Sequence, residues 1–371
     1  MRELTELGLA ERLAETAIET KELIYANRHG QEIWREPRGR EAGYRWPQYS
    51  IHRGRLQMIL FETARARLGA DRVRTGQRLV GLDRKVSGVV AVFAARDGSE
   101  RRVAADVLVG ADGIHSAVRG FLHPGEGPPK WNGRILWRAV TEAEPFLSGR
   151  SMVMAGHQNQ KFVCYPICRA TAARGRSLVN WIAELSVPDR VLADREDWNR
   201  RGDLCDFLPR FENWDFGWLQ APDLIRGADA VYEFPMVDRD PLERWTEGRA
   251  TLLGDAAHPM YPIGSNGASQ AILDARTLAW HLAMARDPDA GLAAYEADRR
   301  PATARIVLAN RANGPEQSMQ LVEERAPAGF ADIRDVVSRE ELEAIAAGYK
   351  RLAGFDVAAL NERASLDVPA T

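Results

Sequence analysis

The sequence has 371 residues, of which 45% are hydrophobic, and this is enough for a large core and about two domains. Its 50 Lys and Arg residues nearly balance 52 Asp and Glu residues, so no strong field directs it to nucleic acid or an acidic membrane. Three cysteines without zinc-type spacing indicate neither a metal site nor a disulfide scaffold. Because the sequence has no signal peptide and no apolar run of about 18 residues, we expect a cytoplasmic protein without a membrane span.

The first part of the chain alternates strands with helices. Helices are expected over 2–13 and from about 53 to 69, and another begins near Ser116. Strands are expected at 21–27, 31–34, 49–52, 79–82, 89–94, 101–104 and 107–109. The last strand is continuously apolar, as strands buried on both faces are, and the three before it form an antiparallel ribbon.

The middle of the chain has a different character. Aromatic, strand-like stretches at 135–140, 162–167, 178–184 and 230–234 predict a second, sheet-rich domain. The first pattern returns with a buried strand at 250–253 and helices over 266–286 and 291–310. We therefore expect a discontinuous first domain (1–129 and 242–310), a sheet domain (130–241) and a helical tail (311–371).

Two places share one design, in which a buried strand ends on glycine and aspartate before a helix begins. These are the turns at Asp112-Gly113 and Gly254-Asp255. In open α/β sheets, ligands bind beyond the carboxyl ends of strands, where a carboxylate can accept hydrogen bonds from ribose or ribityl hydroxyls. Either pair alone is more simply explained as an ordinary turn than as a nucleotide-binding site. After the second, however, small residues lead into an amphipathic helix, whose N-terminus suits the electron-rich edge of a reduced flavin.

The stretch 254–275 resembles the Gly-Asp motif of class A flavoprotein aromatic monooxygenases, the para-hydroxybenzoate and salicylate hydroxylase family. Asp112-Gly113 with Ser116 and Arg119 resembles the family's Asp-Gly motif, and 49–56 resembles its strand-to-helix segment. Residues 261–267 are similar to the phenazine hydroxylases of pyocyanin formation. The resemblance implies an α/β fold: an FAD/NAD(P)-binding, glutathione-reductase-like parallel sheet with an antiparallel ribbon, plus a sheet-rich substrate domain.

The resemblance also implies the cofactor and the residues that bind it. FAD would contact Asp255 through its ribityl chain, Arg53 through its phosphates and the backbone of Leu79 on its adenine side. Asp112 and Gly113 would help to hold FAD, with Asp112 facing the nicotinamide, and Pro262 would lie beside the reactive face of the ring. The residues expected to cradle the isoalloxazine are Gly264, Ser265, Asn266, Gly267, Ala268 and Ser269. NADH or NADPH would reduce FAD, and dioxygen would form a flavin hydroperoxide that hydroxylates a small aromatic substrate.

The family's fold normally begins with a strand, a G-x-G-x-x-G turn and a helix, and this sequence contains no such pattern. We therefore expect the first βαβ unit to be missing, through truncation or a start assigned at an internal methionine. The main hypothesis is an FAD-dependent aromatic hydroxylase. The alternative is a non-catalytic remnant that binds an aromatic ligand or a partner without flavin, and the DNA upstream of Met1 would discriminate the two. A simple NAD-dependent dehydrogenase is less favoured because no hydride-relay pair is evident.

Several other residues leave two interpretations open. Arg138, Tyr165 and Trp181 could shape a substrate pocket, with Arg138 pairing a carboxylate, or could pack in the second sheet. His258 beside a turn is more often structural than an acid or base. Cysteines 164 and 168 are expected in the core. The sequence Arg299-Arg300-Pro301 predicts a solvated helix face with a kink or boundary.

Overall fold

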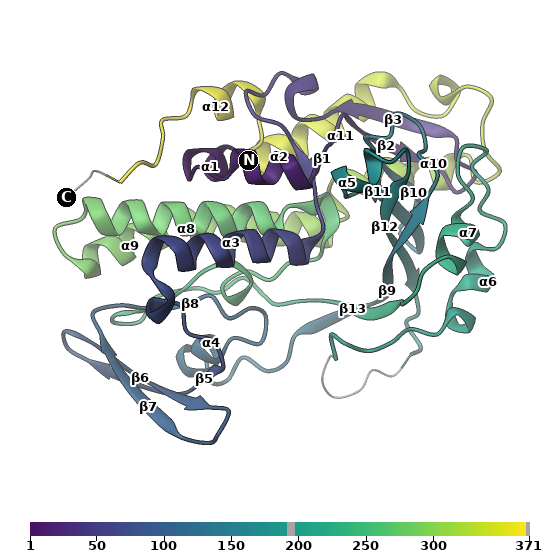
Figure 1. Ribbon diagram of the computed structural model, residues 1–371. Coiled ribbons are helices and arrows are strands. Elements are labelled where there is room, and N and C mark those ends of the chain that lie inside the picture. The colour runs from purple at the N-terminus through teal and green to yellow at the C-terminus, as the bar shows by residue number, and fades with distance from the viewer. Residues whose placement is uncertain (191–196, 369–371) are drawn as a thin grey trace. The chain divides into compact units, whose positions relative to one another are not determined.

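The computed structural model describes residues 1–190 and 197–368, which form two compact units (Figure 1). Unit 1 contains residues 1–62, 131–236 and 315–362, and unit 2 contains 63–130, 237–314 and the chain from 363. These boundaries differ from the predicted domain boundaries because two strands near the N-terminus join the large sheet of unit 1.

Unit 1 is built on a seven-stranded sheet with the strand order β13-β9-β12-β11-β10-β2-β3. Its strands are β2 (Glu22–Ala26), β3 (Glu32–Pro37), β9 (Lys130–Ala143), β10 (Ser151–His157), β11 (Gln160–Pro166), β12 (Ser177–Ser186) and β13 (Tyr232–Asp238). Strands β10 and β2 run parallel, so a segment near the N-terminus pairs with one about 130 residues later. A separate pair is made by β1 (Ile18–Glu19) and β4 (Tyr49–Ser50).

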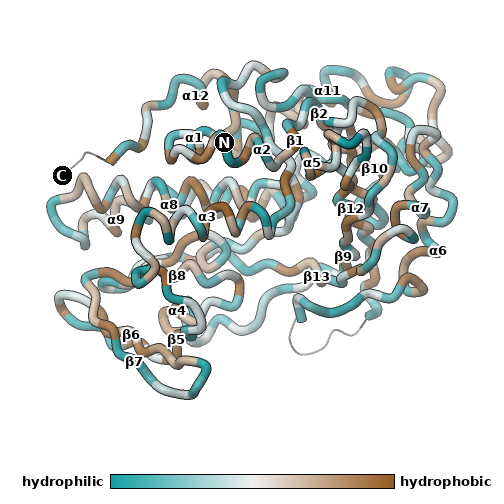
Figure 2. The backbone as a smooth tube through the Cα atoms, viewed as in Figure 1, coloured by the Kyte–Doolittle hydropathy of each residue, from teal (hydrophilic) through white to brown (hydrophobic). Residues whose placement is uncertain are grey.

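Both faces of the seven-stranded sheet are packed, and its central strands are strongly hydrophobic (Figure 2). Trp137 and Trp181 lie on one face, against aromatic residues of the segment that holds α6 (Leu208–Phe211) and α7 (Ala221–Arg226). The other face carries Tyr25 and packs on α10 (Gln317–Arg325) and α11 (Arg339–Leu352). The predicted sheet-rich layer is confirmed.

Unit 2 contains two smaller sheets. Strands β8 (Leu108–Gly110) and β14 (Ala250–Leu252) form a parallel pair, and β5 (Gln77–Lys85), β6 (Gly88–Ala95) and β7 (Glu100–Ala105) form the expected antiparallel ribbon. Leu108 and Val109 are only half-buried, so the expectation that their strand is buried on both faces is wrong. Within the described residues, β8 pairs with β14 alone, which leaves part of its surface uncovered.

Helices α4 (Ala117–Leu122), α8 (Gly267–Met284) and α9 (Pro288–Arg311) complete the core of unit 2. The helix α9 continues through Pro301. The prediction that Arg299 lies on a solvated face is wrong, because its side chain is 7% exposed and pairs with Asp274 of α8. The amphipathic pattern of α9 could not reveal this partner on another helix.

The remaining helices are short or lie outside the two cores. They are α1 (Arg2–Glu6), α2 (Ala10–Thr16), α3 (Arg53–Leu68), α5 (Arg169–Ala172) and α12 (Val357–Glu362). The expected helix over 2–13 is broken at Gly8, which adopts a left-handed φ of 69°. Cys164 is buried as predicted, whereas Cys168 lies beyond β11 and is half-buried. Over residues 1–190 and 197–368, no helix has the length and apolarity that a bilayer crossing needs, and no metal-binding cluster occurs.

Candidate functional site

The Gly254-Asp255 turn follows directly after β14, as the 3-10 turn η4 (Gly254–Ala256). Gly254 has a φ of +58°, and a Cβ atom on it would lie 3.1 Å from the Cβ of Ala271 on α8. Glycine is therefore required both by the left-handed backbone and by the close approach of the helix. Asp255 is exposed although Gly254 and Ala256 are buried, so the turn presents one carboxylate outward from a packed base.

The residues after this turn form a second bend, η5 (Ile263–Ser265), immediately before α8. Gly264 and Ser265 both have left-handed φ angles, of 71° and 54°. The side chain of Asn266 does not cap α8, and Ala268 and Ser269 in its first turn are exposed. The start of an 18-residue helix, with its outward amide groups and positive dipole end, thus lies open. A Cβ on Gly267 would lie 4.0 Å from an Asp255 carboxylate oxygen, which places the turn beside the helix start.

The Asp112-Gly113 turn follows β8 and precedes α4. The Asp112 carboxylate accepts hydrogen bonds from the Ser116 hydroxyl and from the backbone amide of Ala117 (2.7 Å). It therefore closes the N-terminus of α4, and a carboxylate has further lone pairs for a ligand. Gly113 has a φ of +78° with open space around it, so a ligand can approach its backbone.

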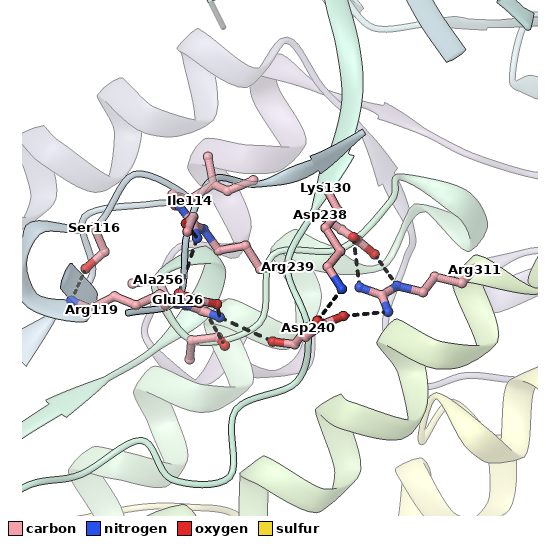
Figure 3. A network of polar contacts seen from close by, with 12 residues as sticks. Ile114, Ser116, Arg119, Glu126, Lys130, Asp238, Arg239, Asp240, Ala256 and Arg311 are labelled. Carbon is pink, nitrogen blue, oxygen red and sulfur yellow. Dashed lines mark hydrogen bonds and ion pairs between the residues drawn. The ribbon is translucent and has the colours of Figure 1, made fainter. Parts of the chain in front are cut away.

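Two arginines, one buried and one partly buried, hold these turns in place, as Figure 3 shows. Arg119 on α4 is 2% exposed and donates to the carbonyls of Ala256 (3.0 Å) and Ala257 (2.8 Å) in the Gly-Asp segment. Arg239 donates to the carbonyl of Ile114, next to Gly113 (3.0 Å). Both arginines also pair with the Glu126 carboxylate. The Glu126 carboxylate thus links the two arginines that hold the Asp112-Gly113 and Gly254-Asp255 turns.

Sequence reasoning did not identify Glu126 and Arg239 as site residues. The same network includes ion pairs of Lys130 with Asp240 and of Arg311 with Asp238 and Asp240 (Figure 3). The alternating charges at 238–240 are the only sequence signal, and they resemble an ordinary solvated segment.

Leu79 lies on β5, an edge strand of the ribbon, and its side chain packs on the core of unit 2. An edge strand has backbone groups without a neighbouring strand, so backbone contact with a ligand is possible there. Pro262 is half-buried at the start of η5. Arg53 is in unit 1, at the start of α3, and is exposed.

Arg138 and Tyr165 share one face of the seven-stranded sheet in unit 1. In the strand register, Arg138 pairs with Ile182 and Tyr165 with Asn180, two residues along the same strand. The Arg138 guanidinium lies over the ring of Phe234, 5.6 Å from its centroid. Burial, and then the nearby charge of Arg53, lower the pKa of Arg138 to about 10, so the side chain stays cationic at neutral pH.

Arg138 has no carboxylate partner and its shielded Nε makes no hydrogen bond within residues 1–190 and 197–368. On the same face, Lys161 pairs with Glu184 at 2.9 Å, and Arg134 lies 3.7 Å from Glu184. Trp181 points to the opposite face. It is fully buried, and its indole donates to the Thr141 hydroxyl at 3.0 Å, which favours packing over a pocket role.

Comparison with known proteins agrees with this geometry. A family model described as an FAD binding domain matches residues 1–186 and 229–310. The chain is 49% identical over 313 residues to phenazine 1,6-dicarboxylic acid hydroxylase of Lysobacter antibioticus, covering 83% of this chain and 77% of that protein. The chain belongs to the FAD-dependent aromatic hydroxylases. The predicted family is thereby confirmed.

Two further proteins are similar to this chain, one in sequence and one in fold. 3-Hydroxybenzoate 6-hydroxylase 1 of Aquipseudomonas alcaligenes is 32% identical, with 71% of this chain and 63% of that protein covered. The solved salicylate hydroxylase substrate complex has a TM-score of 0.71 at 21% identity and covers all of this chain and 89% of its own. The similarity to the salicylate hydroxylase structure confirms the α/β fold of FAD-dependent hydroxylases.

The residues of unit 2 fit an FAD cofactor. Two left-handed residues, an open helix start and an outward carboxylate occur within one short stretch, 255–269. Backbone amides at a helix start suit the electron-rich part of a flavin, and a carboxylate suits ribityl hydroxyls. The side chains that would block such an approach are absent at Gly264 and Gly267.

Proposed function

We propose that the protein is a monooxygenase that binds FAD, consumes NADH or NADPH, and hydroxylates an aromatic or N-heteroaromatic ring bearing a carboxylate. The observation that carries the substrate class is the unpaired Arg138. Its Nε atom is buried without a hydrogen-bond partner in the described part of the chain, and a carboxylate ligand would pair with the guanidinium through charge-assisted hydrogen bonds.

Two relatives support an acidic aromatic substrate by the reactions for which they are named. One hydroxylates phenazine 1,6-dicarboxylic acid and the other 3-hydroxybenzoate, and both compounds are aromatic carboxylates. In unit 1, Arg138 would hold the carboxylate, and the Phe234 ring beneath it would restrict the guanidinium. Tyr165 on the same face offers a hydroxyl that can donate to a bound acid.

The proposed cofactor contacts in unit 2 follow from the geometry of each segment. Asp255 would accept hydrogen bonds from the ribityl chain, and the amides at 264–269 would face the flavin ring. Asp112 and Gly113 would hold another part of FAD, and the edge of β5 at Leu79 its adenine side. Pro262 would shield the ring from water, and the assignment of Arg53 to the FAD phosphates stays a prediction. When bound, FAD reduced by the nicotinamide supplies the activation of dioxygen and the transfer of one oxygen atom.

The substrate class is tested by titrating the FAD-loaded protein with phenazine 1,6-dicarboxylic acid and with its uncharged diamide. The acid is expected to bind at least about tenfold more tightly, since hydrogen bonds to charged groups contribute about 1.5–3 kcal/mol. Arg138→Gln should abolish that preference. Arg134→Gln is the matched control, because Arg134 lies on the same strand and face but near a carboxylate. Equal binding of acid and diamide by the unsubstituted protein would refute the proposed substrate class.

A further inference from the structure

Four polar side chains are buried behind the Gly254-Asp255 turn. They are His258 (3% exposed), Gln270 (2%), Asp274 (0%) and Arg299 (6%). Gln270 and Asp274 come from α8 and Arg299 from α9, so three segments of unit 2 meet in this cluster. Buried groups of this kind are costly unless every one is paired, and here their pairing centres on one carboxylate.

Asp274 accepts three hydrogen bonds. Its Oδ2 atom accepts from the backbone amide of Gly254 (3.0 Å) and from Nε2 of His258 (2.5 Å). Its Oδ1 atom accepts from Nε of Arg299 (2.7 Å), whose other nitrogen Nη2 donates to Gln270 (2.6 Å). Burial opposes the charge of Asp274, but hydrogen bonds and charges from His258 and Arg299 outweigh it and lower its pKa. Asp274 is therefore ionised at neutral pH.

These contacts define which ring nitrogen of His258 donates a hydrogen bond. An ionised carboxylate only accepts hydrogen bonds, so Nε2 of His258 must carry the hydrogen. Its Nδ1 atom is buried without a hydrogen-bond partner in the described part of the chain, and its ring packs on Trp245 at 5.4 Å. His258 is consequently held with Nε2 as its donor to Asp274.

We propose that Asp274 is a positioning residue for the flavin site, which fixes the Gly254 amide and thereby the outward Asp255 carboxylate, and that His258 serves it as a fixed donor. This inference rests on the proposed FAD function. The Gly254 amide lies one residue before Asp255 in a left-handed turn, and Asp274 of α8 accepts its hydrogen bond. Without the Asp274 acceptor, the turn loses its side-chain anchor to α8 while Asp255 itself remains unchanged.

The test compares His258→Gln, His258→Leu and Asp274→Asn with the unsubstituted protein. The side chain of Gln can place an N–H near the position of Nε2, but it cannot act as an acid or base. We expect His258→Gln to bind FAD within about threefold of the unsubstituted protein, and His258→Leu and Asp274→Asn to bind it at least about tenfold more weakly. FAD affinity is read by quenching of flavin fluorescence, and the circular dichroism of bound flavin should shift only in the two weak variants.

Tyr295→Phe provides the control for general loss of stability. Tyr295 is buried in the same core on α9 and donates to the Leu252 carbonyl at 3.0 Å, and within residues 1–190 and 197–368 it makes no hydrogen bond to Asp274. This variant should lower the urea midpoint but leave FAD affinity and the flavin spectrum unchanged. Unaltered FAD affinity in His258→Leu and Asp274→Asn would overturn the positioning role of Asp274 but not the proposed FAD function. Equal loss of affinity in His258→Gln and His258→Leu would overturn the donor role of His258. A failure of the unsubstituted protein to bind FAD would overturn the proposed function as well.

Discussion

Replacing Arg119 by methionine tests whether the Asp-Gly helix supports the Gly-Asp turn. The substitution keeps a long apolar stem but removes the donors to the carbonyls of Ala256, Ala257 and Asp240, at 3.0, 2.8 and 3.2 Å. Ala256 and Ala257 are buried, so water cannot replace the lost donors without disturbing the core. The substitution also leaves Glu126 with Arg239 as its remaining arginine partner.

The expected loss is large for one side chain. Each buried carbonyl left unsatisfied costs about 1–2 kcal/mol, and the weaker contacts together add about 1 kcal/mol, so we expect about 3–5 kcal/mol in all. A loss of this size lowers the melting temperature by roughly 5 °C in a protein of this length. Because Arg119 is 2% exposed, solvent screening does little to reduce the effect.

The assay is urea unfolding followed by circular dichroism, with Arg102→Met as the matched control. Arg102 pairs with Asp83 in the same unit, but its side chain is 63% exposed, so the control should lose about 0.5 kcal/mol or less. A loss below about 1 kcal/mol in Arg119→Met would refute the reasoning, because it would show that the two turns are held independently of Arg119.

Three further predictions concern single positions. Gly254→Ala should weaken FAD binding and cost more stability than Gly113→Ala in paired urea titrations, since both have positive φ but only Gly254 contacts a neighbouring helix. The folded pKa of Asp274 lies below its ordinary value of 3.8, so its stabilisation is present above about pH 4 and is lost as the pH falls through the folded pKa. A urea midpoint of Asp274→Asn that falls as steeply in acid as that of the unsubstituted protein would contradict this. The exposed Cys205 should react with a thiol reagent in the folded state while the buried Cys164 reacts only on unfolding, as peptide mass spectrometry can determine.

Features that depend on neighbouring residues in the sequence were predictable. The Gly254-Asp255 turn, the helix after it and the antiparallel ribbon follow from glycine positions and hydrophobic periodicity, and the structure contains all three. The family resemblance rests on the same local motifs, which explains why it was confirmed although it used only short stretches of the chain.

Features that depend on distant pairing were not predictable. The parallel pairing of β10 with β2 joins segments about 130 residues apart, and no local pattern specifies that partner. Ion pairs between residues far apart in the sequence were not predictable either. Arg299 has the sequence context of a solvated helix face, and only the approach of α8 supplies Asp274 as its partner. Glu126 acquires its role only when two arginines more than 100 residues apart converge on it.

The measurement that tests the central claim most directly is the fate of oxygen during turnover. The FAD-loaded protein is supplied with NADH, phenazine 1,6-dicarboxylic acid and ¹⁸O-labelled dioxygen, and the product is analysed by mass spectrometry. We expect a hydroxylated acid that carries one labelled oxygen atom, and a strongly reduced yield with Arg138→Gln. A protein that binds no FAD, or a product whose oxygen comes from water, would contradict the account.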